Sequence, residues 1–218
     1  MKTLIAKHGT LWSDKFFVIS AIASLLFFVG SLFVNYSAIL YSTAKAGNAT
    51  TDILLQNLPL INTDIIFSEG AMLFAIFIAV LLILEPKTIP FTLKSIALFI
   101  IIRAIFVSMT HLAPPPDSIS SDFSNMRYFS AGADLFFSGH TGLPFMLALV
   151  FWENKPLRIF FFISSFVAAT AVILGHYHYT IDVFSAFFIA YGIYHISLKF
   201  FAKDYKIFKH GLETSAII

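Results

Sequence analysis

The stretch FTLKSIALFIIIRAIFVSMTHL, residues 91–112, decides how the chain folds. It is almost wholly apolar, and Arg103 is its one charge beyond the first turn. The hydrocarbon core of a bilayer is about 30 Å thick, so a helix that rises about 1.5 Å per residue needs roughly 20 apolar residues to cross it. A strand of a membrane barrel would alternate apolar and polar residues, which this stretch does not. It therefore predicts a membrane-spanning helix.

Five further stretches of the same kind lie on either side of it. Polar or proline-bearing segments separate them, for example residues 85–87 and 153–156. Together they predict an all-α fold, a polytopic six-transmembrane-helix bundle that forms a single integral membrane domain over residues 1–218. The six spans are expected at about residues 16–38, 68–84, 91–112, 135–152, 157–175 and 180–200.

The segment TTDILLQNLPLINTDIIF, residues 50–67, is apolar but interrupted by Asp52, Pro59 and Asp64. Charged residues and a proline at this density argue against a segment that crosses the bilayer. A helix that lies at the membrane surface accommodates them better. We therefore expect residues 50–67 to form an interfacial helix.

The composition agrees with a membrane protein and excludes several other classes. Of the 218 residues, 58% are hydrophobic and 12% are charged, and the mean hydropathy is +0.85. Such a chain has too little polar surface to cover a water-soluble globule. Fourteen Lys and Arg against twelve Asp and Glu provide no basic domain for a nucleic acid. Because the sequence contains no cysteine, disulfides, thiolate metal sites and a cysteine nucleophile are excluded.

The basic residues predict the orientation of the bundle. Lys2, Lys7 and Lys15 precede the first apolar stretch, as in a cleaved secretory signal, but this stretch is about twice as long as the apolar region of a signal. We therefore expect it to be retained as the first span. Eleven of the fourteen basic residues then fall on the side that carries both termini. Positive residues favour the cytoplasmic side, so both termini are expected in the cytoplasm.

Ionisable side chains within membrane helices cost several kcal/mol and therefore mark candidate functional sites. Besides Arg103 in the third span, they gather at the outer starts of two other spans. These residues are Asp134 and His140 at the start of the fourth span, and His178 and Asp182 at the start of the sixth. The expected topology brings all of them to the outer side of the membrane, between the third, fourth and sixth helices.

The spacing of these residues indicates a kind of chemistry. His178 and Asp182 stand four residues apart, on one face of a helix, so the carboxylate can reach the imidazole. Such a carboxylate fixes the tautomer of the ring and makes the histidine an effective base or nucleophile. His140 comes from a different span and can serve as the partner in proton transfer. Arg103 adds a permanent charge with forked donors, which favours displacement at phosphorus over displacement at a carbonyl carbon.

Two other functions fit parts of the same set. His140, His178 and Asp182, with His176, would make a metal site of two histidines and one carboxylate, although Arg103 would repel a cation. The same side chains would suit an ion or proton path in a transporter, although the sequence has no evident inverted repeat or broken helix pair.

Two residues of the set have more than one interpretation. Asp134 would cap the fourth helix, bind Arg103 or contact the amine of a headgroup. Tyr179, with Tyr177, would contribute to an aromatic cage for a choline ammonium group, although packing against lipid explains most aromatic residues of a membrane helix.

Two short motifs resemble those of a known family. SGHT at residues 138–141 and HYTIDV at residues 178–183 are similar to the two catalytic motifs of the sphingomyelin synthases, in the phosphatidic acid phosphatase type 2 superfamily. The similarity extends outward to Arg103, Thr110, Leu112, Pro115, Asp134 and His176. The chain departs from the family pattern where Gly132 and Ala133 replace a Cys-Gly pair and where Ala113 replaces a proline.

The resemblance implies transfer of a phosphocholine or phosphoethanolamine headgroup from a glycerophospholipid to ceramide, with release of diacylglycerol. His178 would be the nucleophile that forms a phosphohistidine, Asp182 its orienting carboxylate, and His140 the acid and then the base. The substrate-binding residues would be Arg103, Asp134, Ser138, Gly139, Thr141 and Tyr179. No metal or cofactor is expected, and the implied partners are phospholipid and ceramide in the membrane. If water replaces ceramide, the same groups would make a lipid phosphatase or a phospholipase of the C type.

Overall fold

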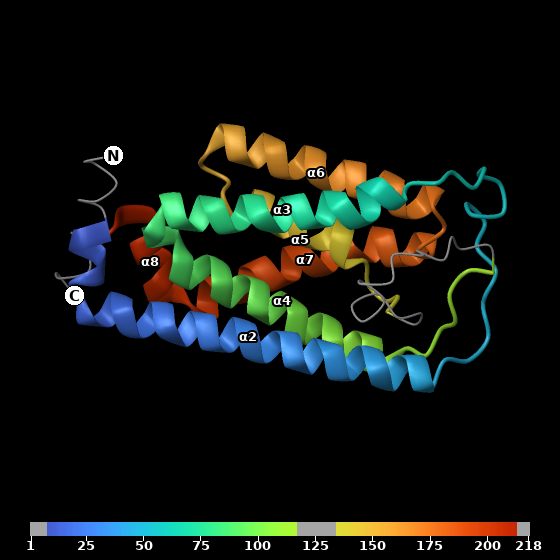
Figure 1. Cartoon of the computed structure of the whole chain (residues 1–218), viewed down its shortest axis with the longest axis horizontal. Coiled ribbons are helices and arrows are strands. Elements are labelled where there is room, and N and C mark those ends of the chain that lie inside the picture. Colours follow the sequence, from blue (N-terminus) through green and yellow to red (C-terminus); the bar gives the residue numbers. More distant parts are fainter. Residues whose placement is uncertain (1–7, 117–133, 213–218) are drawn as a thin grey trace.

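The computed structural model describes residues 8–116 and 134–212, and every regular element in these two ranges is a helix (Figure 1). A short helical segment, residues 8–12, comes first. The elements that follow are α2 (Lys15–Ala44), α3 (Asp64–Leu84), the 3-10 helix η1 (Pro86–Thr88), α4 (Ile89–Met109), α5 (Gly139–Val150), α6 (Lys155–Leu174), α7 (Thr180–Phe200) and α8 (Ala202–His210).

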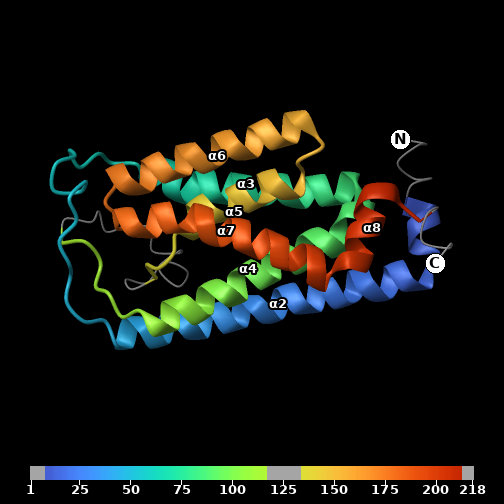
Figure 2. The ribbon, with the colours of Figure 1, turned by 180° about the vertical axis from the view of Figure 1, so that it is seen from behind.

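The long helices lie side by side along one axis, as two opposite views show (Figures 1 and 2). α2 runs along α4, and α5 packs against α6 and α7. Residues 45–63, 110–116 and 175–179 connect helices at one end of the bundle, here called the loop end. Helix α8 and the segment of residues 8–12 lie at the opposite end, here called the terminal end (Figure 1).

Five of the helices in the described ranges, α2, α3, η1 with α4, α6 and α7, are long and apolar enough to cross a bilayer. Their outward faces carry large apolar side chains, including Ile19, Phe33, Leu73 and Phe188. Water would make such a surface unfavourable, whereas lipid chains solvate it. The fold is that of a polytopic, all-helical membrane protein, as the hydropathy predicts.

The predicted span at residues 135–152 is wrong in length, because α5 has only 12 residues, Gly139–Val150. Residues 135–138 are not helical. The reason is a contact between residues far apart in the sequence, since the Arg103 guanidinium donates to the carbonyls of Asp134 and Phe137, and the Ser138 side chain then caps the helix. α5 is a short apolar helix inside the bundle, and Met146 and Leu147 in it are fully buried.

The predicted interfacial helix at residues 50–67 is also wrong, because residues 50–63 form turns and irregular structure and α3 begins at Asp64. The Asp52 carboxylate accepts hydrogen bonds from the N–H groups of Leu54 and Leu55, which is a turn arrangement. Ile61 N–H donates to the carbonyl of Leu174, so the segment packs across the end of α6. These polar contacts satisfy the backbone without a helix.

The core is rich in aromatic side chains. Phe161 on α6 is fully buried and contacts Phe74 and Phe77 of α3 and Phe151 after α5. These contacts join three elements around one ring.

Phe161→Ala should therefore destabilise the fold by about 3–5 kcal/mol, because it leaves a cavity in the core. Phe166→Ala on the same helix is the matched control, because Phe166 is 61% exposed. Thermal unfolding of the purified protein in detergent measures both. Equal shifts of the melting temperature would contradict this account of the core.

Candidate active site

His178 and Asp182 lie together, as their spacing predicts. His178 immediately precedes Tyr179, the N-cap residue of α7, and Asp182 is in the first turn of that helix. His178 Nδ1 is 3.6 Å from Asp182 Oδ2, and both side chains are buried. Asp182 Oδ2 also accepts the backbone N–H of Tyr179 at 3.0 Å. The carboxylate therefore caps α7 and faces the imidazole with the same oxygen.

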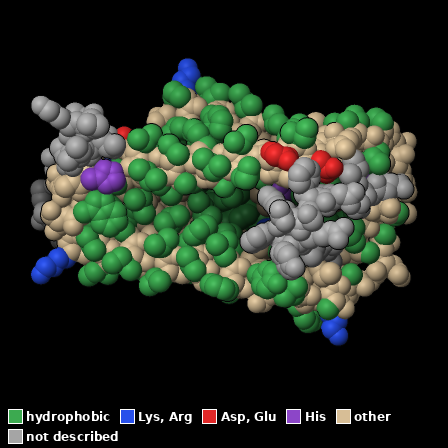
Figure 3. Space-filling view, viewed as in Figure 1, with side chains coloured by type: hydrophobic (Ala, Val, Ile, Leu, Met, Phe, Trp, Pro, Cys, Tyr) green, Lys and Arg blue, Asp and Glu red, His purple; other side chains and the backbone are tan. Residues whose placement is uncertain are grey.

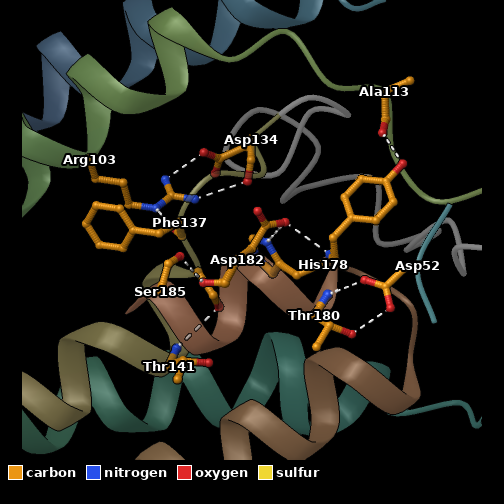
Figure 4. A network of polar contacts seen from close by, with 12 residues as sticks. Asp52, Arg103, Ala113, Asp134, Phe137, Thr141, His178, Thr180, Asp182 and Ser185 are labelled. Atoms are coloured by element: carbon orange, nitrogen blue, oxygen red, sulfur yellow. Dashed lines mark hydrogen bonds and ion pairs between the residues drawn. The ribbon is translucent and has the colours of Figure 1, made fainter. Parts of the chain in front are cut away.

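Arg103 occupies the last part of α4 and is buried. Its Nη1 is 2.6 Å from Asp134 Oδ1, Nη2 donates to the Asp134 carbonyl at 3.1 Å, and Nε donates to the Phe137 carbonyl at 2.8 Å (Figure 4). Of the three roles considered for Asp134, the structure supports the ion pair with Arg103. A guanidinium has five N–H donors, so two have no partner among the described residues.

Gly139 allows this arrangement. A Cβ at residue 139 would stand 3.2 Å from Arg103 Nε, closer than carbon and nitrogen normally approach. The preceding residue, Ser138, accepts the N–H of Thr141 and donates its own backbone N–H to the Asp182 carbonyl at 3.0 Å. The start of α5 is therefore fixed to Arg103 on one side and to α7 on the other.

His140, in the first turn of α5, is partly buried and lines the same pocket as Arg103. Its ring stacks on Phe67 of α3, with 4.2 Å between centroids. Phe67 stacks in turn on Tyr177, also at 4.2 Å, and the Tyr177 hydroxyl donates to Asp64. Burial and the neighbouring Asp64 carboxylate raise the pKa of Tyr177, which keeps this hydroxyl a donor.

Two of the predicted binding residues, Tyr179 and Thr141, are buried, and their roles in binding stay predictions. Tyr179 is 1% exposed, and its hydroxyl donates to the Ala113 carbonyl and accepts the N–H of Thr50. It therefore joins three loops, and an aromatic cage built from its ring is not what the structure supports. Thr141 is fully buried, and its carbonyl accepts a hydrogen bond from Ser165.

An apolar pocket of about 540 Å³ opens beside the site, between α3, α4, α5 and α6. Its walls include Phe74, Phe99 and Leu143, and its polar end includes Arg103, Asp134, Gly139 and His140. Figure 3 shows a hollow lined by hydrophobic side chains on this face of the molecule. His178 does not line the pocket. The pocket thus has a long apolar wall and a charged end. A molecule with an apolar chain and a charged headgroup would fit it.

Two residues of the site were missed by sequence reasoning. Phe67 carries no chemical signal among 27 phenylalanines. Asp52 was assigned to a surface helix, yet its carboxylate accepts hydrogen bonds from the N–H and the hydroxyl of Thr180, at 2.6 and 2.7 Å (Figure 4). It thereby fixes the first turn of α7 next to His178. The one available signal was a carboxylate near the start of an otherwise apolar segment that was expected to be a surface helix.

In the described ranges, no three His, Asp or Glu side chains are grouped as metal ligands. His176, the fourth member of the metal hypothesis, is buried, and its Nε2 has no partner among the described residues.

Residues 132–199 match the family model described as PAP2 superfamily C-terminal. The matched segment includes His140, His178 and Asp182 but not Arg103 or Phe67. The match supports the phosphatidic acid phosphatase type 2 superfamily and an enzyme of the phosphatase or phosphotransferase kind that acts on lipid. It does not single out the sphingomyelin synthases. No curated protein and no solved structure matches the chain.

Asp52 predicts a pH dependence of stability. Partial burial raises the pKa of this carboxyl, but hydrogen bonds from Thr180, Leu55 and Leu54 outweigh burial and hold the pKa below the ordinary 3.8. A lowered carboxyl pKa stabilises the fold above the unfolded-state value, and this contribution is lost as the pH falls through the folded-state value. The Asp52→Asn protein should therefore have a lower melting temperature than the unchanged protein at neutral pH. This difference in melting temperature should disappear as the pH falls below about 3.8. A difference that stays constant with pH would show that the charge of Asp52 contributes nothing.

Proposed function

We propose that the chain is a membrane phosphotransferase resembling sphingomyelin synthase, which moves a phosphocholine or phosphoethanolamine headgroup from a glycerophospholipid to ceramide or a related lipid alcohol. One observation carries the proposal. Arg103 and His140 lie at the polar end of an apolar pocket, and a hydrogen bond from Ser138 to Asp182 joins the start of α5 to the turn that carries His178 and its carboxylate. A nucleophile, a proton donor and a fixed cation can together carry out phosphoryl transfer, and an apolar pocket can hold the chains of a lipid substrate.

In the first step, an imidazole nitrogen of His178 attacks the phosphorus of the glycerophospholipid. The nitrogen–phosphorus bond forms as the bond from phosphorus to the diacylglycerol oxygen breaks. His140 gives its proton to that oxygen, so diacylglycerol leaves as an alcohol. Asp182 balances the positive charge that develops on His178, since its Oδ2 faces Nδ1.

In the second step, the hydroxyl of ceramide takes the place of diacylglycerol. His140, now without its proton, accepts the hydroxyl proton while the oxygen attacks phosphorus and the bond to His178 breaks. The product carries the headgroup, and both histidines return to their starting states. No metal or cofactor takes part in either step.

Arg103 would stabilise the negative phosphoryl oxygens in both steps, since it lines the pocket and two of its N–H donors are not used by described residues. Asp134 holds the guanidinium in place, and the narrow approach that Gly139 allows keeps Arg103 beside His140. The apolar walls of the pocket would take the acyl chains of the substrate.

A second candidate is a lipid phosphatase or a phospholipase of the C type, with water as the acceptor. The match to the PAP2 superfamily favours it as much as it favours a transferase. The same residues would act in the same roles, and only the second step would differ.

Turnover by the purified protein in mixed micelles separates the two candidates. The substrates are phosphatidylcholine and phosphatidylethanolamine, each with and without ceramide, and products are identified by mass spectrometry. A phosphosphingolipid that forms only with ceramide is the result expected of a transferase. Diacylglycerol with free phosphocholine or phosphoethanolamine would establish the hydrolase instead.

Two substitutions test the assigned histidines. His178→Ala should abolish turnover because it removes the nucleophile, and His140→Ala should lower it by about 10²–10⁴-fold because it removes the acid and base. His195→Ala is the matched control, since His195 is an exposed histidine further along α7. Normal turnover by a His178→Ala protein with the melting temperature of the parent would contradict the assignment of His178 as the nucleophile.

Phe67 should affect turnover through His140, on whose ring it stacks. Phe67→Leu keeps an apolar side chain but removes the ring on which His140 stacks. Because the His140 imidazole is then less well positioned, kcat should fall by about ten- to a hundredfold, with a smaller change in KM. Phe67→Tyr keeps the ring and should retain activity. Equal kcat for all three proteins would mean that the stack does not position His140.

We also propose that the loop end, where the site lies, faces the outer side of the membrane and that the terminal end faces the cytoplasm. Since the sequence has no cysteine, a single introduced one is a unique label. Asn57→Cys, exposed at the loop end, should react with an impermeant maleimide on intact cells. Lys206→Cys, exposed at the terminal end, should react only after the membrane is opened. The reverse pattern would invert the proposed orientation.

A further inference from the structure

A second pocket, of about 500 Å³, lies at the terminal end between α2, α4, α7 and α8. Three lysines line it, Lys94, Lys199 and Lys203, with a single carboxylate, Asp204. It shares no residue with the apolar pocket at the candidate active site. It is therefore distinct from the pocket that is proposed to hold the substrate.

The one carboxylate in this pocket is already neutralised. Asp204 is buried, its Oδ2 lies 2.7 Å from Lys94 Nζ, and its Oδ1 accepts the Ser20 hydroxyl at 2.5 Å. Lys94 Nζ also donates to the Ser20 oxygen at 2.7 Å. Lys94, Ser20 and Asp204 therefore form a closed group with no net charge.

The other two lysines carry the charge of the pocket. Lys199, at the end of α7, and Lys203, in the first turn of α8, are both exposed. Neither forms an ion pair with a carboxylate in the described ranges. With the Lys94–Asp204 pair balanced, they leave the pocket with two positive charges, and it is complementary to an anion.

The remaining walls are apolar and open to the outside of the bundle. Ile19 on α2 is 68% exposed and Phe200 on α7 is 73% exposed, and Phe16 and Ala23 continue the same wall along α2. α2 and α7 are two of the helices that are long and apolar enough to cross a bilayer. An inorganic anion would use the lysines and leave these walls unused. A lipid with an anionic headgroup would use both.

We propose that this pocket binds an anionic phospholipid of the leaflet at the terminal end. Lys199 and Lys203 hold its phosphate, and an acyl chain lies against Ile19, Ala23 and Phe200. Basic pockets between membrane helices bind anionic headgroups in this way, and each lysine near the surface contributes about 1 kcal/mol. The lipid lies against α2, α7 and α8 at the place where the Ser20 hydroxyl of α2 donates to Asp204 of α8.

The test measures how many phosphatidylglycerol molecules the purified protein retains, by native mass spectrometry, with phosphatidylcholine as the neutral comparison. We expect one phosphatidylglycerol per chain to be retained in preference to phosphatidylcholine. Lys199→Gln with Lys203→Gln should weaken its binding by roughly thirtyfold. Lys155→Gln with Lys206→Gln removes the same charge from two exposed lysines outside the pocket and should leave binding unchanged.

Two further measurements separate a lipid site from general attraction of anions. Ala23→Trp fills the wall without changing charge at an exposed position, and it should also displace the lipid. Inorganic phosphate at the lipid concentration should not compete. Equal weakening by both lysine pairs, an unaffected Ala23→Trp protein, or displacement by phosphate would overturn the proposal. Because phosphatidylcholine is also a proposed substrate, each outcome is judged from phosphatidylglycerol binding compared between variants, none of which alters the pocket at the candidate active site.

Discussion

The position of one buried charge governs the arrangement of the site. Arg103 lies within an otherwise apolar helix, where an uncompensated guanidinium would cost several kcal/mol. The chain compensates it with the Asp134 carboxylate and with the carbonyls of Asp134 and Phe137. Those contacts hold residues 134–138 out of helical conformation, and α5 begins at Gly139 as a result. His140 therefore reaches the pocket from the first turn of a short helix.

A second constraint comes from the first turn of α7. Asp182 caps that turn through the Tyr179 N–H, and Asp52 from the distant connection between α2 and α3 holds Thr180. The same turn presents His178 to Asp182. Groups that satisfy backbone donors at a helix start thus also place the candidate nucleophile. In a membrane protein, the same polar groups must both satisfy the backbone and position the site, because no water is present to hydrogen-bond a buried N–H group that lacks a protein partner.

The sequence predicts the features that depend on local pattern. Hydropathy predicts the helices that became α2, α3, α4, α6 and α7, and a spacing of four residues predicts the His178–Asp182 contact. It could not predict where α5 starts, because that depends on a side chain 31 residues or more away in the sequence. Phe67 was missed for a similar reason, since stacking on His140 leaves no trace in a chain so rich in phenylalanine.

The central claim is that the reaction passes through a phosphohistidine, whichever acceptor follows. The most direct measurement supplies the wild-type protein with phosphatidylcholine labelled in its phosphocholine group, without ceramide, and quenches the mixture under alkaline conditions. Peptides are then examined by mass spectrometry. A phosphocholine adduct on His178 is the expected result. An adduct on His140, or continued turnover with no adduct on either histidine, would contradict it.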